Sequence, residues 1–211
     1  MKTNKLFATM LALLCVIGIS GCDKEDTEPG TESALNTDLY FEADMNGKSL
    51  FLPEGKDGYV SEAGAYYGPA KTTGCVSRQA MRLKGADMRK SLEVSFIKWS
   101  ETCIKSCSQV EEMFKVSSYT FGNLETTSDE RVIDGVLIRY TDVDGKVWSS
   151  DFGSGDQTGS SFRIVEHISN TKDKNSKKIT TTEFSAKLYD GNGNKIDLTN
   201  GKMMSRSVVC E

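Results

Sequence analysis

Histidine is nearly absent from the sequence, because the 211 residues contain only His167. A serine or cysteine nucleophile is usually activated by a nearby base, and a third group orients that base. His167 lies in an alternating polar and apolar stretch, and no partners for a catalytic triad can be named. A G-x-S-x-G elbow is also absent, since the stretch 152–161 has the right composition but the wrong spacing. The sequence therefore gives no support for a serine hydrolase.

The chain also lacks a strong charge of one sign and, after residue 19, a long apolar run. A membrane-spanning helix needs about 20 apolar residues, and no later segment provides them. The 26 lysines and arginines against 30 aspartates and glutamates give a net charge of −4. A near-neutral domain does not have the basic surface that nucleic acid requires. We therefore expect no nucleic-acid partner.

The first 21 residues have the three parts of a secretory signal peptide. Two lysines provide a positive start, Phe7–Ile19 is almost entirely apolar, and Ser20-Gly21 provides small residues at the end. The apolar run is shorter than the roughly 20 residues of a spanning helix. We therefore expect residues 1–21 to be removed during export.

The four residues Ile19-Ser20-Gly21-Cys22 resemble the lipobox of bacterial lipoproteins. Their position directly after the apolar run makes the resemblance specific. It implies that Cys22 becomes the first residue of the mature protein and carries acyl chains on its sulfur and its amine. Each buried CH₂ group adds about 0.8 kcal/mol of membrane affinity, so several chains hold a protein firmly. We expect attachment to a membrane through Cys22.

Residues 22–36 have the composition of an acidic spacer. They contain five acidic residues, one lysine, Pro29 and Gly30, with almost no apolar content. Low hydrophobicity with net charge is typical of a disordered segment. Asp23-Lys24-Glu25-Asp26 resembles the acidic export signal that follows the lipidated cysteine in Bacteroidota. That resemblance implies display on the outside of the outer membrane, and the periplasmic face is the alternative.

Four cysteines remain once Cys15 is removed and Cys22 is acylated. They are Cys75, Cys103, Cys107 and Cys210. An even number in an exported chain indicates disulfides, and three connectivities are possible. We favour Cys103–Cys107 as a local bond and Cys75–Cys210 as a long one. A zinc site formed by Cys103, Cys107 and His167 is the alternative, although no second close pair of cysteines supports it.

From residue 37 onward, apolar and polar residues alternate, which is typical of β-strands. Turn signals at Asn46-Gly47 and Asp144-Gly145 separate neighbouring stretches. The end of the chain reads as three strands with breaks at 190–194 and at Asn200-Gly201. The pattern of about ten strands predicts a single all-β, mainly antiparallel domain over residues 37–211, built as a β-sandwich or jelly roll.

One short helix is expected near residues 108–115. Ser108 and Glu111 have the spacing of a capping box, and Val110, Met113 and Phe114 share one helical face. We expect this face to belong to the core. The polar and basic stretch 170–178 is typical of a hairpin tip.

Three stretches carry a family resemblance: FEADMNGKSL, GVLIRYTDVDGKVWSSD followed by SSFRI, and EFSAKLYDGNGNKIDLTNGKM. Their order of strands and turns resembles small uncharacterised surface lipoproteins of Bacteroidota, over most of residues 39–204. The resemblance implies a β-sandwich on a lipid anchor. It implies no catalytic residues.

Asp142 and Asp144 are candidates for calcium ligands, because they place several oxygen atoms in one turn. Aspartate, asparagine and glycine are also the residues that hairpin turns require, and we favour that role. We expect no other metal or cofactor.

Five aromatic residues are candidates for stacking on sugars, because flat rings offer large apolar faces. They are Tyr59, Tyr66, Tyr67, Trp99 and Trp148. The stretch around Tyr66 and Tyr67 is flanked by glycine, so we expect it in a loop or an edge strand. For both tryptophans, packing in the core or against the sheet is the alternative to sugar stacking.

We expect a non-enzymatic binding or interaction role at the cell envelope. A glycan-binding module of a nutrient-uptake system is the alternative, and a hydrolase with two carboxylates is third.

Overall fold

The computed structural model describes residues 39–70, 73–104, 106–124, 132–169 and 178–207. These ranges contain ten β-strands and one helix. In chain order the elements are β1 (Tyr40–Met45), β2 (Lys48–Pro53), β3 (Val60–Pro69), β4 (Cys75–Lys84), β5 (Ser91–Ser100), α1 (Cys107–Glu112), β6 (Gly135–Thr141), β7 (Val147–Ser149), β8 (Ser161–Ser169), β9 (Lys178–Tyr189) and β10 (Lys195–Arg206). The prediction of an all-β fold with one short helix is confirmed.

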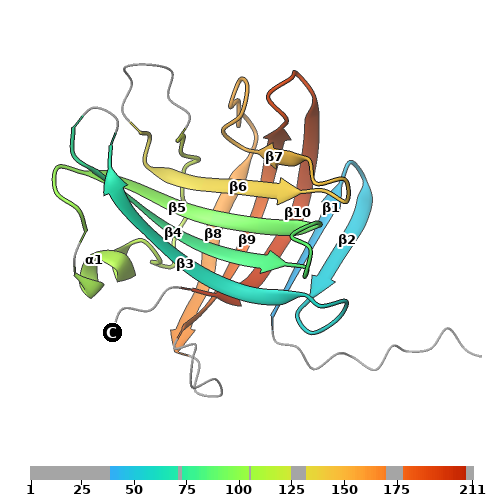
Figure 1. The fold of residues 1–211 in the computed structure, drawn as a ribbon, viewed down its shortest axis with the longest axis horizontal. Helices are drawn as coiled ribbons and strands as arrows, with labels where there is room; N and C mark the ends of the chain where they lie inside the picture. Colours follow the sequence, from blue (N-terminus) through green and yellow to red (C-terminus); the bar gives the residue numbers. More distant parts are fainter. Residues whose placement is uncertain (1–38, 71–72, 105, 125–131, 170–177, 208–211) are drawn as a thin grey trace, which may run out of the picture. The chain divides into compact units, whose positions relative to one another are not determined.

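The ten strands form one hydrogen-bonded sheet in the order β2-β1-β10-β9-β7-β6-β5-β4-β3, with β8 paired to β9. Every pairing between these strands is antiparallel. The sheet curls, so that strand β3 at one end approaches β10, where Ser61 Oγ lies 2.7 Å from Ser205 Oγ. Figure 1 shows β3–β6 running across β8–β10. Because the sheet is continuous, the predicted sandwich of separate sheets is not confirmed.

Phe96 of β5 lies in the main core cluster. This cluster contains buried residues of β4–β6 and of β8–β10, the strands that run across one another. Its ring centroid is 5.0 Å from that of Phe114, 5.3 Å from that of Tyr119 and 5.7 Å from that of Phe162. The alternation predicted for residues 91–99 therefore places the expected face inside. Val110 of α1 and Phe114, two residues after the helix, both belong to this cluster, so the helix covers one end of the core.

Helix α1 begins earlier than predicted. Its N-cap is Ser106, which accepts the Gln109 N–H, while the Gln109 side chain accepts the Ser106 N–H. The prediction that Ser108 and Glu111 form the capping box is therefore wrong. The Glu111 carboxylate instead lies 3.3 Å from His167 Nε2 and 3.5 Å from Lys178 Nζ. These contacts join α1 to strands β8 and β9.

Two Asn-Gly pairs have different roles in the sheet. Asn46 and Gly47 have φ values of 48° and 76° and form the predicted turn between β1 and β2. Asn200-Gly201 was expected to break a strand, but β10 continues through it with a β-bulge. A side chain at Gly201 would meet the Phe184 ring at 2.7 Å, so glycine is needed for this close approach. The prediction of three strands in this region is therefore wrong.

The structure pairs Cys75 with Cys103. In the β4–β5 register Cys75 lies opposite Ser100, so the chain leaving β5 brings Cys103 back beside it. The favoured pairs Cys103–Cys107 and Cys75–Cys210 are therefore wrong. Of the three possible connectivities, the observed bond is compatible only with the one that would also pair Cys107 with Cys210. Cys210 lies outside the described residues.

Several predictions concern residues outside the described ranges. They are the signal peptide, Cys22 and the spacer within residues 1–38, and all but Lys178 of the expected hairpin tip 170–178. Within the described part of the chain, no helix has the length and apolar character needed to cross a membrane.

Candidate functional site

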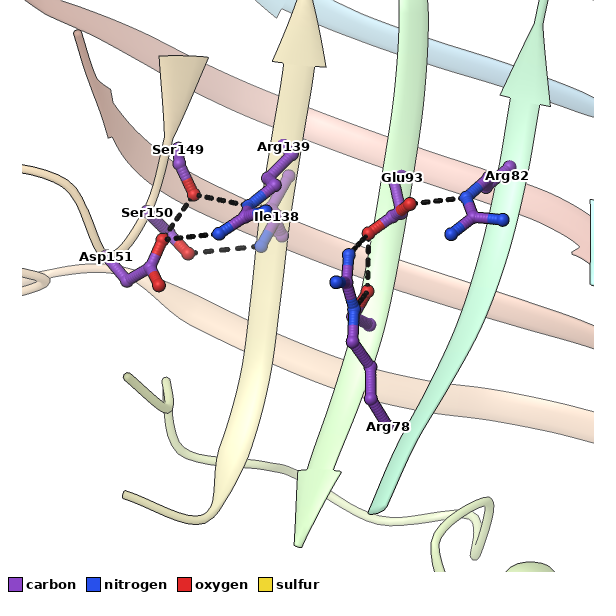
Figure 2. A network of polar contacts seen from close by, with 9 residues as sticks. Arg78, Arg82, Glu93, Ile138, Arg139, Ser149, Ser150 and Asp151 are labelled. Carbon is purple, nitrogen blue, oxygen red and sulfur yellow. Dashed lines mark hydrogen bonds and ion pairs between the residues drawn. The ribbon is translucent and has the colours of Figure 1, made fainter. Parts of the chain in front are cut away.

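A charged network lies on the face of β4 and β5 that points away from the main core. Glu93 accepts hydrogen bonds from Arg78 and from Arg82, which lie on the neighbouring strand (Figure 2). Ser95 Oγ donates to Glu93 Oε1 at 2.7 Å and accepts from Arg78 Nε at 3.0 Å. One carboxylate therefore joins two arginines and a serine across a strand pair.

A second network follows on β6 and β7. Asp151 is buried and accepts a hydrogen bond from Ser149, while Arg139 Nη2 lies 3.7 Å from its Oδ1 atom (Figure 2). Ser150 Oγ accepts the Ile138 N–H at 3.0 Å. Since these bonds attach the chain after β7 to β6, the network has a structural role.

The acidity of the described carboxyl groups does not indicate acid catalysis. Burial raises the pKa of Glu93, but the Arg78 charge and the hydrogen bonds from Arg82 and Ser95 outweigh it, so the pKa is lowered overall. Every other described carboxyl group with a resolved pKa shift is also shifted down. A general acid needs a raised pKa, and the hydrolase proposal gains no support from these groups.

Replacing Glu93 with glutamine is expected to lower the free energy of unfolding by about 2–3 kcal/mol at neutral pH. The variant leaves two half-buried guanidinium groups without their carboxylate, and breaking a fully buried pair costs roughly 3–5 kcal/mol. Urea unfolding monitored by tryptophan fluorescence measures the loss. The matched control is Glu62→Gln, because Glu62 is more exposed and lies 2.8 Å from Lys84 in a single ion pair. We expect a loss below about 1 kcal/mol there.

The same comparison has a predicted pH dependence. Because the folded-state pKa of Glu93 is lowered, its contribution is fully present above the unfolded pKa near 4.5 and is lost as the pH falls through the folded value. The difference between wild type and Glu93→Gln should therefore shrink in acid. A difference that stays constant down to pH 2 would contradict this assignment.

The structure does not bring the five candidate aromatic residues into one row. Tyr59 is buried, Tyr66 and Tyr67 are exposed on β3, and β3 is an edge strand, as expected. Trp99 Nε1 donates to the Thr73 carbonyl at 2.9 Å. Trp148 packs against the main core, and Lys146 Nζ lies 4.2 Å from its ring centroid. A single stacking platform built from all five is therefore absent from this arrangement.

Asp142 has the role of a turn residue. Its Oδ1 atom accepts the N–H groups of Asp144 and Lys146 at 3.0 and 2.9 Å, and its Oδ2 atom accepts Trp148 Nε1 at 3.0 Å. These bonds account for the conformation of the β6–β7 turn without a metal. Calcium binding at Asp142 and Asp144 stays a prediction.

The zinc alternative loses one of its ligands, because Cys103 is in a disulfide and offers no thiolate. His167 is held by other groups: Nδ1 lies 2.8 Å from Thr180 Oγ1, and the ring stacks on Phe114. Burial lowers the pKa of His167 despite the nearby Glu111 carboxylate. His167 therefore has a packing role between α1 and the sheet.

A concave surface of about 690 Å³ lies at one end of the sheet, and we call it the loop hollow. Its walls are strand β2, the β2–β3 loop (54–59), the β4–β5 loop (85–90) and Val143 of the β6–β7 turn. Phe51 and Val143 provide exposed apolar surface, with exposed fractions of 57% and 53%. This volume is in the range of small-molecule sites, about 300–1,000 Å³.

Charged groups of both signs line the loop hollow. The cations are Lys56, Arg89 and Lys90, and the carboxylates are Asp57 and Asp87. Asp87 Oδ1 accepts the Arg89 N–H at 3.0 Å, and its other oxygen lies 3.9 Å from Arg89 Nε. The hollow therefore combines apolar walls with several polar groups, as ligand sites commonly do.

Backbone hydrogen bonds hold the loops of the hollow in place. Gly55 N–H donates to the Tyr59 carbonyl at 2.8 Å, and Lys90 N–H donates to the Asp142 carbonyl at 3.3 Å. Three of the five described non-glycine residues with positive φ lie in these loops, namely Asp57 (53°), Met88 (63°) and Lys90 (48°). Such conformations are costly and gather at functional sites, so they favour this end of the sheet as a binding site.

The sequence predicted only Tyr59 among the residues that line the hollow. Tyr59 lies in its floor, where burial raises the pKa of the phenol and Asp57 and Asp87 add to the rise. Phe51 was not predicted, although its place in the short β2 stretch after Asn46-Gly47 was a usable signal for an exposed edge residue. Arg89 and Lys90 gave no signal, because two adjacent cations are common in turns.

Comparison with known proteins found no relative: no family model, no curated protein and no solved structure matches the chain.

Proposed function

We propose that the protein is a lipid-anchored cell-envelope protein whose β-domain binds a ligand, without catalysis, in the loop hollow. The observation that carries the proposal is the hollow itself, a concave surface of about 690 Å³ with apolar walls and charged groups of both signs. The loops around it are fixed by backbone hydrogen bonds. A site formed in advance loses little conformational entropy on binding.

The lining of the hollow indicates the kind of ligand. Phe51 and Val143 favour an apolar face, while the neighbouring Lys90 and Arg89 favour hydroxyl, carbonyl or carboxylate oxygens. Asp57 and Asp87 add acceptors for hydroxyl or amine groups. A small amphipathic molecule, or the end of a longer chain, fits this description better than a purely apolar ligand.

The sequence supports attachment to the envelope. A signal peptide over residues 1–21, the lipobox that ends in Cys22 and the acidic stretch after it form one consistent series. The described domain begins at Leu39, so 16 residues separate it from Cys22. This spacer is long enough to place the domain away from the lipid surface. Display on the outer surface of the outer membrane is our proposal, and the periplasmic face is the alternative.

A glycan is the second candidate ligand. Phe51 is favourable for it, because an aromatic ring with an exposed fraction of 57% lies beside groups that can bind hydroxyls. Its ring centroid is 5.8 Å from that of Tyr40, which supports the ring from the neighbouring strand. Phe51 lines the same hollow as Asp57 and Arg89, whose side chains can bind sugar hydroxyls.

Replacing Phe51 with alanine is expected to weaken ligand binding about 10- to 100-fold. Burial of one phenylalanine side chain contributes roughly 1.5–3 kcal/mol, and the variant removes that contribution. The mature protein with Cys22→Ala, which keeps it soluble, is first applied to a glycan array and a peptide array. Calorimetry with the best ligand then measures the dissociation constant.

The matched control is Tyr66→Ala, because Tyr66 also has an exposed fraction of 57% and lies outside the hollow. We expect its affinity to equal that of the unsubstituted protein. Binding that is lost with Tyr66→Ala and kept with Phe51→Ala would move the site to β3. A protein that binds neither glycans nor peptides would contradict the proposed function.

A further inference from the structure

Strand β3 is the last strand of the sheet on its side, and four of its five central residues are exposed, while Gly64 is half-buried. They run Ala63-Gly64-Ala65-Tyr66-Tyr67, and we call them the edge segment. Figure 1 shows β3 as the outermost strand beside β4. Long edge strands offer a row of backbone donors and acceptors to another strand, and proteins commonly block such edges.

At one end of β3, side chains of other segments already bind the backbone of the edge. Ser61 N–H donates to Glu54 Oε1 at 3.0 Å, and the Ser61 carbonyl accepts from Arg206 Nη1 at 3.0 Å. The backbone of Ser61 therefore faces away from β4. The N–H and C=O groups of successive residues in a strand point to alternate sides, and the β3–β4 register is unbroken. The backbone groups of Ala63, Ala65 and Tyr67 therefore also point away from β4.

Within the described part of the chain, no strand pairs with the outward groups of Ala63, Ala65 and Tyr67. The next outward position is Pro69, which has no N–H group to donate. The open edge therefore has three outward residues, with Ala65 in the middle, and it ends at Ser61 on one side and at Pro69 on the other.

We propose that a second copy of this chain pairs with the edge segment, antiparallel, about a two-fold axis at Ala65. In this register Ala65 faces Ala65 of the second copy, and Ala63 faces Tyr67. All three outward residues of each copy then form hydrogen bonds. A register centred one or two residues earlier needs Ser61, whose groups are already bound, and a register centred one residue later needs Pro69.

Side-chain size and charge agree with this register. Tyr66 faces Gly64 of the second copy, and Tyr67 faces Ala63, so each large ring meets a small residue. Glu62, which lies 2.8 Å from Lys84 in its own copy, faces Gly68, and no like charges are opposed. The Arg82 guanidinium lies over Gly64, so Tyr66 of the second copy would meet it as a cation–π partner.

Cysteine cross-linking of the full mature chain tests the register. Ala65→Cys should form a disulfide-linked dimer under mild oxidation, because facing Cα atoms in a hydrogen-bonded pair lie about 5.5 Å apart. The matched controls lie on the same strand. In the proposed register, two Ala63→Cys positions are about 13 Å apart, and two Val60→Cys positions are about 33 Å apart.

We expect at least tenfold more cross-linked dimer for Ala65→Cys than for either control, and the chain without an added cysteine measures the background. Equal cross-linking of all three variants would show random encounter and overturn the proposal. Preferred cross-linking of Ala63→Cys would overturn the register.

Sedimentation equilibrium of the chain without added cysteines gives an independent measurement. Ala65→Lys places two like charges at the axis and should raise the dimer dissociation constant at least tenfold, while Val60→Lys leaves it unchanged. Both positions are exposed, and circular dichroism checks that the variants fold. A chain that stays monomeric at all concentrations would overturn the proposal and leave the edge to a strand from a different protein. Ligand binding in the loop hollow would be unaffected.

Discussion

Replacing Cys75 and Cys103 together with alanine is expected to lower the free energy of unfolding by about 3–4 kcal/mol. The disulfide closes a loop with a sequence separation of 28 residues, and the chain-entropy model gives about this value for that length. For a domain of this size the midpoint of thermal unfolding should fall by roughly 10 °C. Thermal and urea unfolding of the oxidised protein measure the effect.

The single variant Cys75→Ala is the control for this prediction. It breaks the same bond, so its loss of stability should equal that of the double variant to within about 1 kcal/mol, the cost of a changed side chain at a buried position. Equal stability of the double variant and the unsubstituted protein would show that the bond between β4 and the segment after β5 does not form in solution.

Replacing Cys22 with alanine is expected to abolish acylation of the protein and to release it from the membrane. The lipobox interpretation makes the Cys22 sulfur the attachment point, and each acyl CH₂ group contributes about 0.8 kcal/mol of membrane affinity. Loss of several chains therefore reduces membrane affinity by many orders of magnitude. Metabolic labelling with an alkyne fatty acid measures acylation, and detergent phase separation measures the partition.

Cys15→Ala is the matched control, because Cys15 lies in the same apolar run and is expected to be removed with the signal peptide. Its label and its partition should equal those of the unsubstituted protein. If Cys22→Ala kept the fatty-acid label, attachment through Cys22 would be refuted, whatever the membrane partition.

Features fixed by neighbouring residues could be predicted from the sequence. The turn at Asn46-Gly47 needs only two residues that tolerate positive φ, and the inward face of 91–99 needs only the two-residue period of a strand. The helix was also found, but its start was misplaced, because Ser106 and Ser108 are both good N-caps. The contacts of Glu111 with His167 and Lys178 show why the later start was not used.

Features fixed by distant residues could not be predicted. Asn200-Gly201 has the composition of a turn, yet Asn200 donates to Asp44 at 2.9 Å and Gly201 packs against Phe184, so the strand continues. The Cys75–Cys103 bond depends on the β4–β5 register in the same way. The spacing of residues in the sequence identified neither Phe184 as the neighbour of Gly201 nor Cys103 as the partner of Cys75.

The loop hollow is the clearest case of such long-range placement. Phe51, Arg89 and Val143 belong to three separate hairpins, and only the curled sheet brings them to one surface. The strand pattern predicted hairpins but not which of their ends meet. Candidate stacking residues chosen by type alone were therefore scattered, with Tyr59 in the hollow and Tyr66 on β3.

The anchoring of this domain to the cell envelope is tested most directly by mass spectrometry of the protein purified from its own membranes. We predict that the mature chain begins at Cys22, and that its first peptide carries a diacylglycerol on the sulfur and an acyl chain on the amine. A chain that still contains residues 1–21, or one whose Cys22 thiol is unmodified, would contradict the account.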